Sequence, residues 1–162
     1  MQELWVVAGL VFDAGGRVLI AQRPTDKALA GRWEFPGGKV AADETAHAAI
    51  VRELREEIGI EAGDAERLMY YAAVYPGRTI WLDVWMIKDW SGEPRGLDAQ
   101  ALEWVEPSRL REHDILEADA PIVAALSRRS ASGKTDTRCW PTVDPVVLPE
   151  LGKADTRSGI TT

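Results

Sequence analysis

The sequence predicts a fold of the α/β (α+β) class, either a mixed α+β arrangement or an α/β/α sandwich. Apolar runs rich in β-branched residues, which favour strands, lie on both sides of one clear helical segment at residues 45–58. A second helical segment at 118–126 follows the last of these runs. This order of elements is expected when helices cover a sheet. The length of 162 residues is enough for one domain with a single core and a tail.

The N-terminal part is predicted to form a β-hairpin. Residues 4–12 are almost all apolar, as is typical of a buried strand. Asp13-Ala14-Gly15-Gly16 has the composition of a tight turn, so residues 17–23 are expected to return as the second strand. The next expected elements are a polar loop over 24–31, a short strand over 33–35 and a break at Pro36-Gly37-Gly38.

The helix over residues 45–58 is the clearest element. It is dense in Ala, Leu, Arg and Glu and contains neither Gly nor Pro. Asp43-Glu44-Thr45 supplies residue types that cap a helix at its start, and Gly59 is suited to end it.

Strands dominate the second half of the predicted domain. Residues 68–75 and 79–90 are expected to form two strands around a Pro76-Gly77 turn, because this stretch is rich in aromatic and β-branched residues. The remaining expected elements are a strand at 101–105, a helical turn at 107–110 and a final helix at 118–126.

The character of the chain changes from about Arg128. Residues 130–135 are small and polar, and no amphipathic period follows. We therefore predict a domain over residues 1–127 and a disordered or loosely docked tail over 128–162, whose removal should change little. A short apolar piece, Val146-Val147-Leu148, could dock on the domain.

The overall composition argues against several classes of protein. The formal net charge is −7, whereas proteins that bind duplex nucleic acid usually carry a basic surface, so no nucleic-acid polymer is expected as a partner. No apolar run approaches the roughly 20 residues of a membrane span, and the N-terminus lacks a secretory signal pattern. The single cysteine, Cys139, cannot form an intrachain disulfide. We expect a cytoplasmic monomer that does not bind membranes.

Three acidic residues are expected on one face of the predicted helix. Glu53, Glu56 and Glu57 are spaced by three and four residues and therefore project together. Carboxylates this close repel one another unless a cation lies among them, and Mg²⁺ favours such oxygen ligands. The simpler interpretation is a solvated acidic face paired with Arg52 and Arg55. Gly37-Gly38, where the backbone can approach a ligand, and the further acid Glu44 favour a site.

These residues form a long pattern. Gly38 is followed after five residues by Glu44, and after seven more by Arg52-Glu53-Leu54-Arg55-Glu56-Glu57-Ile58-Gly59-Ile60. The pattern resembles the Nudix box, Gly-x5-Glu-x7-Arg-Glu-U-x-Glu-Glu-x-Gly-U with U a bulky apolar residue, at every specified position. The wider resemblance runs from about Leu4 to Leu126 and is greatest to bacterial MutT-type members that act on nucleoside triphosphates.

The resemblance implies an α/β/α sandwich with a mixed β-sheet and a bound Mg²⁺ or Mn²⁺. The implied metal ligands are Glu53, Glu56, Glu57 and the backbone carbonyl of Gly37. Arg52 would orient a glutamate through a charge-assisted pair, and Glu44 would support the loop. A carboxylate must also accept a proton from the attacking water. Glu53 is one candidate. Asp98, in a later loop near Glu103, is another, although close relatives tend to have Glu at that position.

The resemblance also suggests residues that bind a small-molecule nucleotide. Arg23 and Lys39 could contact phosphate, although either could be ordinary surface charge. Arg78 matches a position near the base or sugar. Glu34 and Phe35 match a stretch that lines the base pocket, although a buried Phe35 without a ligand role is an alternative.

Asp119 departs from the family pattern. MutT-type proteins specific for 8-oxo-dGTP commonly have Asn at this position, which offers both a donor and an acceptor, whereas ionised Asp only accepts. Asp here also resembles relatives that hydrolyse CTP or modified pyrimidine triphosphates. A capping role for the last helix is the alternative without a ligand.

Four functions follow as hypotheses. The leading one is hydrolysis of 8-oxo-dGTP to the monophosphate and pyrophosphate, and the runner-up is the same reaction on CTP or a modified pyrimidine nucleotide. A different Nudix substrate, such as ADP-ribose or a dinucleoside polyphosphate, fits the chain length less well. A non-catalytic module that recognises a modified base is disfavoured because the box is intact.

Overall fold

The computed structural model describes residues 2–132, 140 and 142–149. Its strands are β1 (Gln2–Val11), β2 (Val18–Gln22), β3 (Trp33–Glu34), β4 (Gly37–Lys39), β5 (Glu61–Ala62), β6 (Ala65–Tyr75), β7 (Arg78–Ile87), β8 (Trp90–Ser91), β9 (Leu102–Val105) and β10 (Val146–Val147). Its helices are α1 (Ala46–Ile58), α2 (Ala120–Ser132) and the 3-10 helices η1 (Pro107–Glu112) and η2 (Glu117–Asp119).

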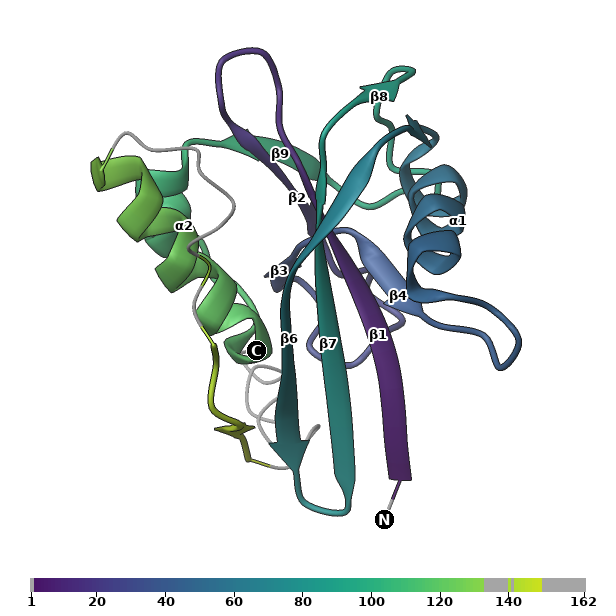
Figure 1. Ribbon diagram of the computed structural model, residues 1–162, viewed down its shortest axis with the longest axis vertical. Coiled ribbons are helices and arrows are strands. Elements are labelled where there is room, and N and C mark those ends of the chain that lie inside the picture. The colour runs from purple at the N-terminus through teal and green to yellow at the C-terminus, as the bar shows by residue number, and fades with distance from the viewer. Residues whose placement is uncertain (1, 133–139, 141, 150–162) are drawn as a thin grey trace, which may run out of the picture.

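The largest sheet has the strand order β10-β6-β7-β1-β4. Strands β1 and β7 pair in parallel, whereas β6 pairs antiparallel with β7 and β4 pairs antiparallel with β1, so the sheet is mixed. Figure 1 shows α1 on one side of this sheet and α2 on the other. The predicted α/β/α sandwich with a mixed sheet is therefore confirmed.

Each face of the sheet packs against one helix. Alternate residues of a strand point to opposite faces, which is why β1 contributes Val7 and Val11 to the core under α1 and Leu10 to the core under α2. Ile50, Leu54 and Ile58 form the apolar stripe of α1 and are fully buried. The acidic residues between them are thereby held at the side of the helix that does not face the core.

The expected limits of α1 are confirmed in detail. Thr45 caps the start of the helix, where its hydroxyl oxygen accepts a hydrogen bond from Ala48 N at 3.1 Å. Gly59 ends it with a φ of 71°, a left-handed conformation that suits glycine, and its N–H donates to the Arg55 carbonyl.

The N-terminal hairpin was predicted incorrectly. The turn forms, with Gly16 N donating to the Asp13 carbonyl at 3.1 Å, but β1 and β2 share only the isolated bridge between Phe12 and Val18. Both edges of β1 are occupied, by β7 and β4, so β2 joins β3 and β9 in a second sheet. Gly37 and Gly38 form strand β4 on β1, where the expectation was a simple break.

Three smaller differences concern the second half of the predicted domain. The strand expected over 79–90 ends at Ile87, and Trp90 belongs to a short strand that pairs with β5, which was not expected. The strand β6 begins at Ala65, three residues before its expected start at 68. Helix α2 continues to Ser132, beyond the predicted domain boundary at 127.

No helix in the described residues is long and apolar enough to cross a membrane.

Part of the predicted tail docks on the domain. Strand β10 adds to the edge of β6 in parallel, and Leu148 is 9% exposed within the core on the α2 side. Trp140 and Val143 pack against the same core. The apolar piece at 146–148 therefore docks, as the sequence allowed. The other tail residues, 133–139, 141 and 150–162, lie outside the described residues, and the division into domain and tail stays a prediction.

Candidate active site

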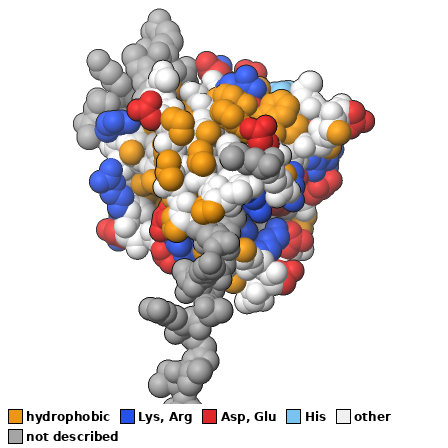
Figure 2. Space-filling model, turned by 90° about the horizontal axis from the view of Figure 1, so that it is seen from below, with side chains coloured by type: hydrophobic (Ala, Val, Ile, Leu, Met, Phe, Trp, Pro, Cys, Tyr) orange, Lys and Arg blue, Asp and Glu red, His pale blue; other side chains and the backbone are white. Residues whose placement is uncertain are grey.

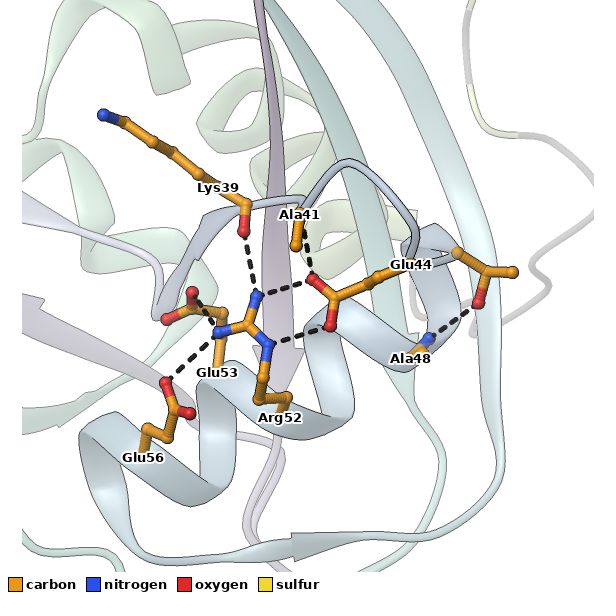
Figure 3. A network of polar contacts seen from close by, with 8 residues as sticks. Lys39, Ala41, Glu44, Ala48, Arg52, Glu53 and Glu56 are labelled. Atoms are coloured by element: carbon orange, nitrogen blue, oxygen red, sulfur yellow. Dashed lines mark hydrogen bonds and ion pairs between the residues drawn. The ribbon is translucent and has the colours of Figure 1, made fainter.

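Arg52 joins the acidic residues of α1 to the loop that precedes the helix. Figure 3 shows its guanidinium at the centre of a network. Its Nη1 donates to Glu53 Oε1 at 2.8 Å and to Glu56 Oε2 at 3.2 Å. Its Nε and Nη2 donate to the two carboxylate oxygens of Glu44 at 2.8 and 2.6 Å. Nη2 also donates to the Lys39 carbonyl at 3.0 Å, so one cation fixes strand β4, the loop and the helix together.

Glu44 serves this network as a support. Its hydrogen bonds from Arg52, together with one from Ala41 N, lower the pKa of its carboxyl to about 2. Glu44 is therefore ionised throughout the physiological range. A carboxylate engaged in this way on both oxygens is poorly suited to accept a proton, which agrees with the expected supporting role.

Glu53 approaches the backbone of β4 closely. A Cβ atom at Gly38 would collide with the Glu53 carboxylate, which explains why this position is a glycine. Burial raises the pKa of Glu53, and the neighbouring carboxylates of Glu56 and Glu44 add to this, although Arg52 opposes them. Glu53 thus combines a fixed position with a weakened preference for the ionised form.

Glu57 is the most strongly perturbed residue of the acidic face. Its Oε2 accepts a hydrogen bond from Gly37 N at 3.3 Å. Burial and then the charge of Glu53 raise its pKa to about 8, with Glu34 adding to the effect and Lys27 opposing it. The charge effects show that the acidic residues lie close together, as their spacing predicts. The Glu53–Glu57 pair is not neutralised by Arg52 alone.

The acidic face suits a hard divalent cation. In the described residues no three acidic, histidine or cysteine side chains already surround one point, because Glu53 and Glu56 turn toward Arg52 and Glu57 toward Gly37 N. The available donors are all oxygen atoms, namely the three carboxylates and the adjacent Gly37 carbonyl. Such donors match Mg²⁺ or Mn²⁺, and a cation there would offset both the burial and the Glu53 charge that raise the pKa of Glu57.

A second group of predicted site residues surrounds Asp119. Its side chain is 5% exposed, and its carboxylate accepts a hydrogen bond from the Phe35 N–H. Burial and then the charge of Glu34 raise the pKa of Asp119 to about 7, while the Phe35 N–H and Arg23 lower it. Arg23 Nη1 in turn lies 2.9 Å from Glu34 Oε2. Residues from the end of β2, from β3 and from η2 therefore meet at one place, since Arg23 directly follows β2.

Two tyrosines of β6 complete this second group. The Tyr71 hydroxyl is buried and donates to the Ala118 carbonyl at 2.7 Å. Burial and then the charge of Asp119 raise the pKa of Tyr75, whereas Arg78 lowers it. The Nε of Arg78 is buried without a hydrogen-bond partner among the described residues, so it remains able to donate to a ligand. Figure 2 views this end of the molecule from below, where basic, acidic and hydrophobic side chains lie side by side.

Three predicted site residues lie differently from the rest. The side chain of Phe35 packs in the core, 4% exposed, and only its N–H faces Asp119. Lys39 is exposed, and its side chain extends away from Arg52 (Figure 3). Asp98 is exposed in a loop that Leu97 N and Gln100 Nε2 fasten to the Glu57 carbonyl at 3.0 and 3.1 Å. This fastening places the loop at the end of α1. Glu103, the other acidic residue considered near Asp98 in the sequence, lies in β9, and its Oε2 is 3.1 Å from His113 Nε2.

Sequence reasoning missed two features of the site. Lys27 lies close enough to Glu57 to lower its pKa, although its segment was predicted only as a polar loop. Glu34 acts on both Glu57 and Asp119, and so links the acidic face to the second group. The only available signal for Lys27 was a cation in the polar loop, four residues after Arg23. No local pattern indicated the double position of Glu34.

The NUDIX domain family matches residues 3–126, which include every residue of both groups. The chain belongs to the Nudix family. Among similar proteins, the CTP pyrophosphohydrolase of Escherichia coli is 38% identical over 84% of this chain and 100% of its own. The putative 8-oxo-dGTP diphosphatase 2 of Mycobacterium tuberculosis is 42% identical over 83% and 96%. A solved MutT structure, from work on Aliivibrio salmonicida and Vibrio cholerae, has a TM-score of 0.70 at 32% identity and covers 79% of this chain and 99% of its own.

The site of this Nudix chain therefore has two ends. The acidic face of α1 and strand β4 form the first, which we call the carboxylate end. Arg23, Glu34, Tyr75, Arg78 and Asp119 form the second, which we call the nucleoside end. Glu34 is the residue whose charge acts on both.

Proposed function

We propose that this Nudix chain hydrolyses a nucleoside triphosphate to the monophosphate and pyrophosphate with Mg²⁺ or Mn²⁺, and that 8-oxo-dGTP is its leading substrate. The observation that carries the proposal is the acidic face of α1, where Glu53 and Glu57 lie together against the glycines of β4. The cation would be held by Glu53, Glu56, Glu57 and the Gly37 carbonyl. When bound, it neutralises phosphate charge and lowers the pKa of a water.

The chain itself supplies position and proton transfer. Arg52 holds Glu53 at 2.8 Å and prevents it from rotating freely, which keeps its carboxylate beside β4. Glu53 is our first candidate to accept the proton of the attacking water, because Arg52 fixes its carboxylate beside the glycines of β4. Asp98 remains the alternative base, since its loop is fastened to the end of α1.

The nucleoside end supports the choice of base. Arg78 has a buried nitrogen with no partner among the described residues, and Asp119 is buried with a pKa of about 7. A protonated Asp119 both donates and accepts, as the Asn of 8-oxo-dGTP-specific proteins does, and so can pair with the oxidised purine. An ionised Asp119 only accepts and suits the exocyclic amine of cytosine. CTP or a modified pyrimidine triphosphate is therefore the second candidate, and the similar CTP pyrophosphohydrolase supports it.

The decisive experiment is a hydrolysis panel on the purified chain. It would compare 8-oxo-dGTP, dGTP, CTP, dCTP and ADP-ribose, with Mg²⁺, with Mn²⁺ and with EDTA, and would separate pyrophosphate from phosphate among the products. We expect pyrophosphate release, loss of turnover in EDTA and the highest kcat/KM for 8-oxo-dGTP. Preference for CTP would select the second candidate. Full activity in EDTA, or preference for ADP-ribose, would overturn the proposal.

Two further expectations accompany this function. We propose that the chain acts as a cytoplasmic monomer on a small-molecule nucleotide. Its mass of 17.8 kDa provides the test of the oligomeric state, because light scattering on the purified chain distinguishes this value from twice it.

A further inference from the structure

The docked part of the C-terminal tail lies against the nucleoside end. We call residues 140 and 142–149 the C-terminal strap. The strap lies outside residues 3–126, which the Nudix family matches. Its strand β10 pairs in parallel with β6, with Val146 opposite Ala73 and Val147 opposite Val74. Leu148 N continues this contact by donating to the Val74 carbonyl at 2.8 Å. In Figure 1 the yellow strand runs beside β6 and the start of α2.

The two sides of the strap differ sharply. Val147 is 79% exposed, whereas Leu148 is 9% exposed. Because neighbouring strand residues point to opposite faces, Val146 and Leu148 face α2 and Val147 faces solvent. Leu148 belongs to the same hydrophobic core as Phe35, Tyr71 and Ala118, so the strap extends the core that includes the residues bonded to or next to Asp119.

The register between β10 and β6 places Leu148 beside Tyr75. Val147 lies opposite Val74, so the next position of the ladder places Leu148 beside Tyr75 on the face toward α2. Four residues earlier on β6, on the same face, Tyr71 donates to the Ala118 carbonyl at 2.7 Å, and Ala118 directly precedes Asp119. The influence of Asp119 and Arg78 on the pKa of Tyr75 agrees with this placement. The strap therefore lies beside Tyr75, on the face of β6 where Tyr71 holds the Ala118–Asp119 segment.

We propose that the C-terminal strap, through Leu148, positions Tyr75 and the Ala118–Asp119 segment and so helps to set which nucleobase this chain prefers. The inference rests on the proposed function, since it concerns selectivity at that site. Leu148 is a positioning residue, because it acts through Tyr75 and the core behind Asp119. The carboxylate end, which does not contact the strap in the described interactions, should keep its chemistry when the strap is altered.

The test compares two neighbouring substitutions in the full chain. Leu148→Ala removes the buried contact, and Val147→Ala is the matched control, because it removes a similar side chain from the same strand on the exposed side. For each variant, kcat and KM would be measured for the best nucleotide and for the same nucleotide with a disfavoured base. We expect Leu148→Ala to reduce the preference between bases about fivefold, mainly through KM, with kcat changed by less than about twofold. Val147→Ala should leave the preference unchanged.

The outcomes separate this inference from the proposed function. If the unaltered chain hydrolyses no nucleoside triphosphate, the proposed function fails, and this inference fails with it. If the unaltered chain is active but Leu148→Ala and Val147→Ala retain the same base preference, only this inference is overturned. A merely structural role would change kcat/KM for all nucleotides alike and leave the preference between bases intact, and that result would overturn the inference too. Should Leu148→Ala melt below the assay temperature, Leu148→Val, which keeps an apolar side chain, provides the same comparison.

Discussion

The two ends of the site are built in opposite ways. The carboxylate end takes its residues from one continuous stretch, from Gly37 to Glu57, in which Arg52 joins Glu44, Glu53 and Glu56 and the Gly37 N–H binds Glu57. The nucleoside end draws on residues as distant in sequence as Arg23 and Asp119, and its key carboxyl is held by burial and one backbone N–H. Chemistry that is common to a family can therefore be encoded locally. Under our proposal, selectivity is assembled from several parts of the fold, so it would change when any one of them changes.

The largest effect is expected at the carboxylate end. Glu57→Gln keeps the size of the side chain but removes a proposed ligand, so we expect kcat to fall by at least roughly 10³-fold, equivalent to about 4 kcal/mol. Glu61→Gln is the control, because Glu61 is exposed and pairs only with Arg55 in the described interactions. Steady-state turnover and thermal melting would be measured for both. A kcat near that of the unaltered chain would show that Glu57 is not a ligand.

The next effect tests the close approach of helix and strand. Gly38→Ala introduces a Cβ that collides with the Glu53 carboxylate, so we expect kcat to fall by roughly 100-fold as Glu53 is displaced. Gly15→Ala, in an open turn where the nearest atom would lie 3.4 Å away, should be almost silent. Equal turnover in the two variants would mean that the position of Glu53 is unimportant. The contact between Glu53 and the backbone of β4 would then not matter for turnover.

The features that the sequence could predict are the local ones, as in the comparison of the two ends of the site. The capping residue Thr45, the apolar stripe of α1 and the shared face of its glutamates depend on contacts within a few turns of one helix, so spacing alone reveals them. The pairing of β1 with β4 and β7, and the departure of β2 into a second sheet, depend on which distant strands compete for the same edge. No local pattern records that competition.

The nucleoside end shows the limit most clearly. The resemblance to the Nudix family picked out Arg23, Arg78 and Asp119 individually, and the structure brings them near one another. It could not indicate that Asp119 is buried against the Phe35 N–H, because that contact joins η2 to the residue after β3, far away in sequence. Nor could composition alone show which residue of the apolar piece 146–148 enters the core, where Leu148 is buried and Val147 is exposed.

A smaller and more selective effect is expected from Asp119. Asp119→Ala should reduce kcat/KM for the preferred nucleotide at least about tenfold, a loss on the order of 1.4 kcal/mol, and change poor substrates much less. Asp119→Asn, which donates and accepts as protonated Asp does, should preserve 8-oxo-dGTP hydrolysis and weaken CTP hydrolysis. Equal losses for every nucleotide would show that Asp119 supports structure and does not contact the base.

The same residue should make stability depend on pH. The pKa of Asp119 rises from 3.8 to about 7 on folding, so the folded chain binds this proton more tightly than the unfolded chain. Its contribution is fully present below about pH 4 and is lost as the pH rises through about 7. Urea unfolding at about pH 5 and about pH 8 should show a smaller fall in the free energy of unfolding for Asp119→Asn than for the unaltered chain. Identical pH dependence in the two proteins would contradict the burial of an ionisable group here.

The smallest expected effect distinguishes the strap from the rest of the tail. A chain that ends at residue 149 retains Trp140, Val143, Val146 and Leu148, so its melting temperature should match that of the full chain. A chain that ends at Ser132 loses them. Burying one large apolar side chain contributes roughly 1.5–3 kcal/mol, part of which is offset by the entropy of ordering the strap, so we expect a fall of about 5 °C.

This truncation also revises the expectation that removal of the whole tail changes little. Turnover on a poor substrate should survive in the chain that ends at Ser132, because the carboxylate end is intact, while the preference between bases weakens as it does in Leu148→Ala. Calorimetry on the two truncated chains provides the comparison. Equal melting temperatures would mean that the strap adds nothing to stability. Loss of all turnover in the shorter chain would mean that the two ends of the site are not separable, and that the strap supports the chemistry as well as the selectivity.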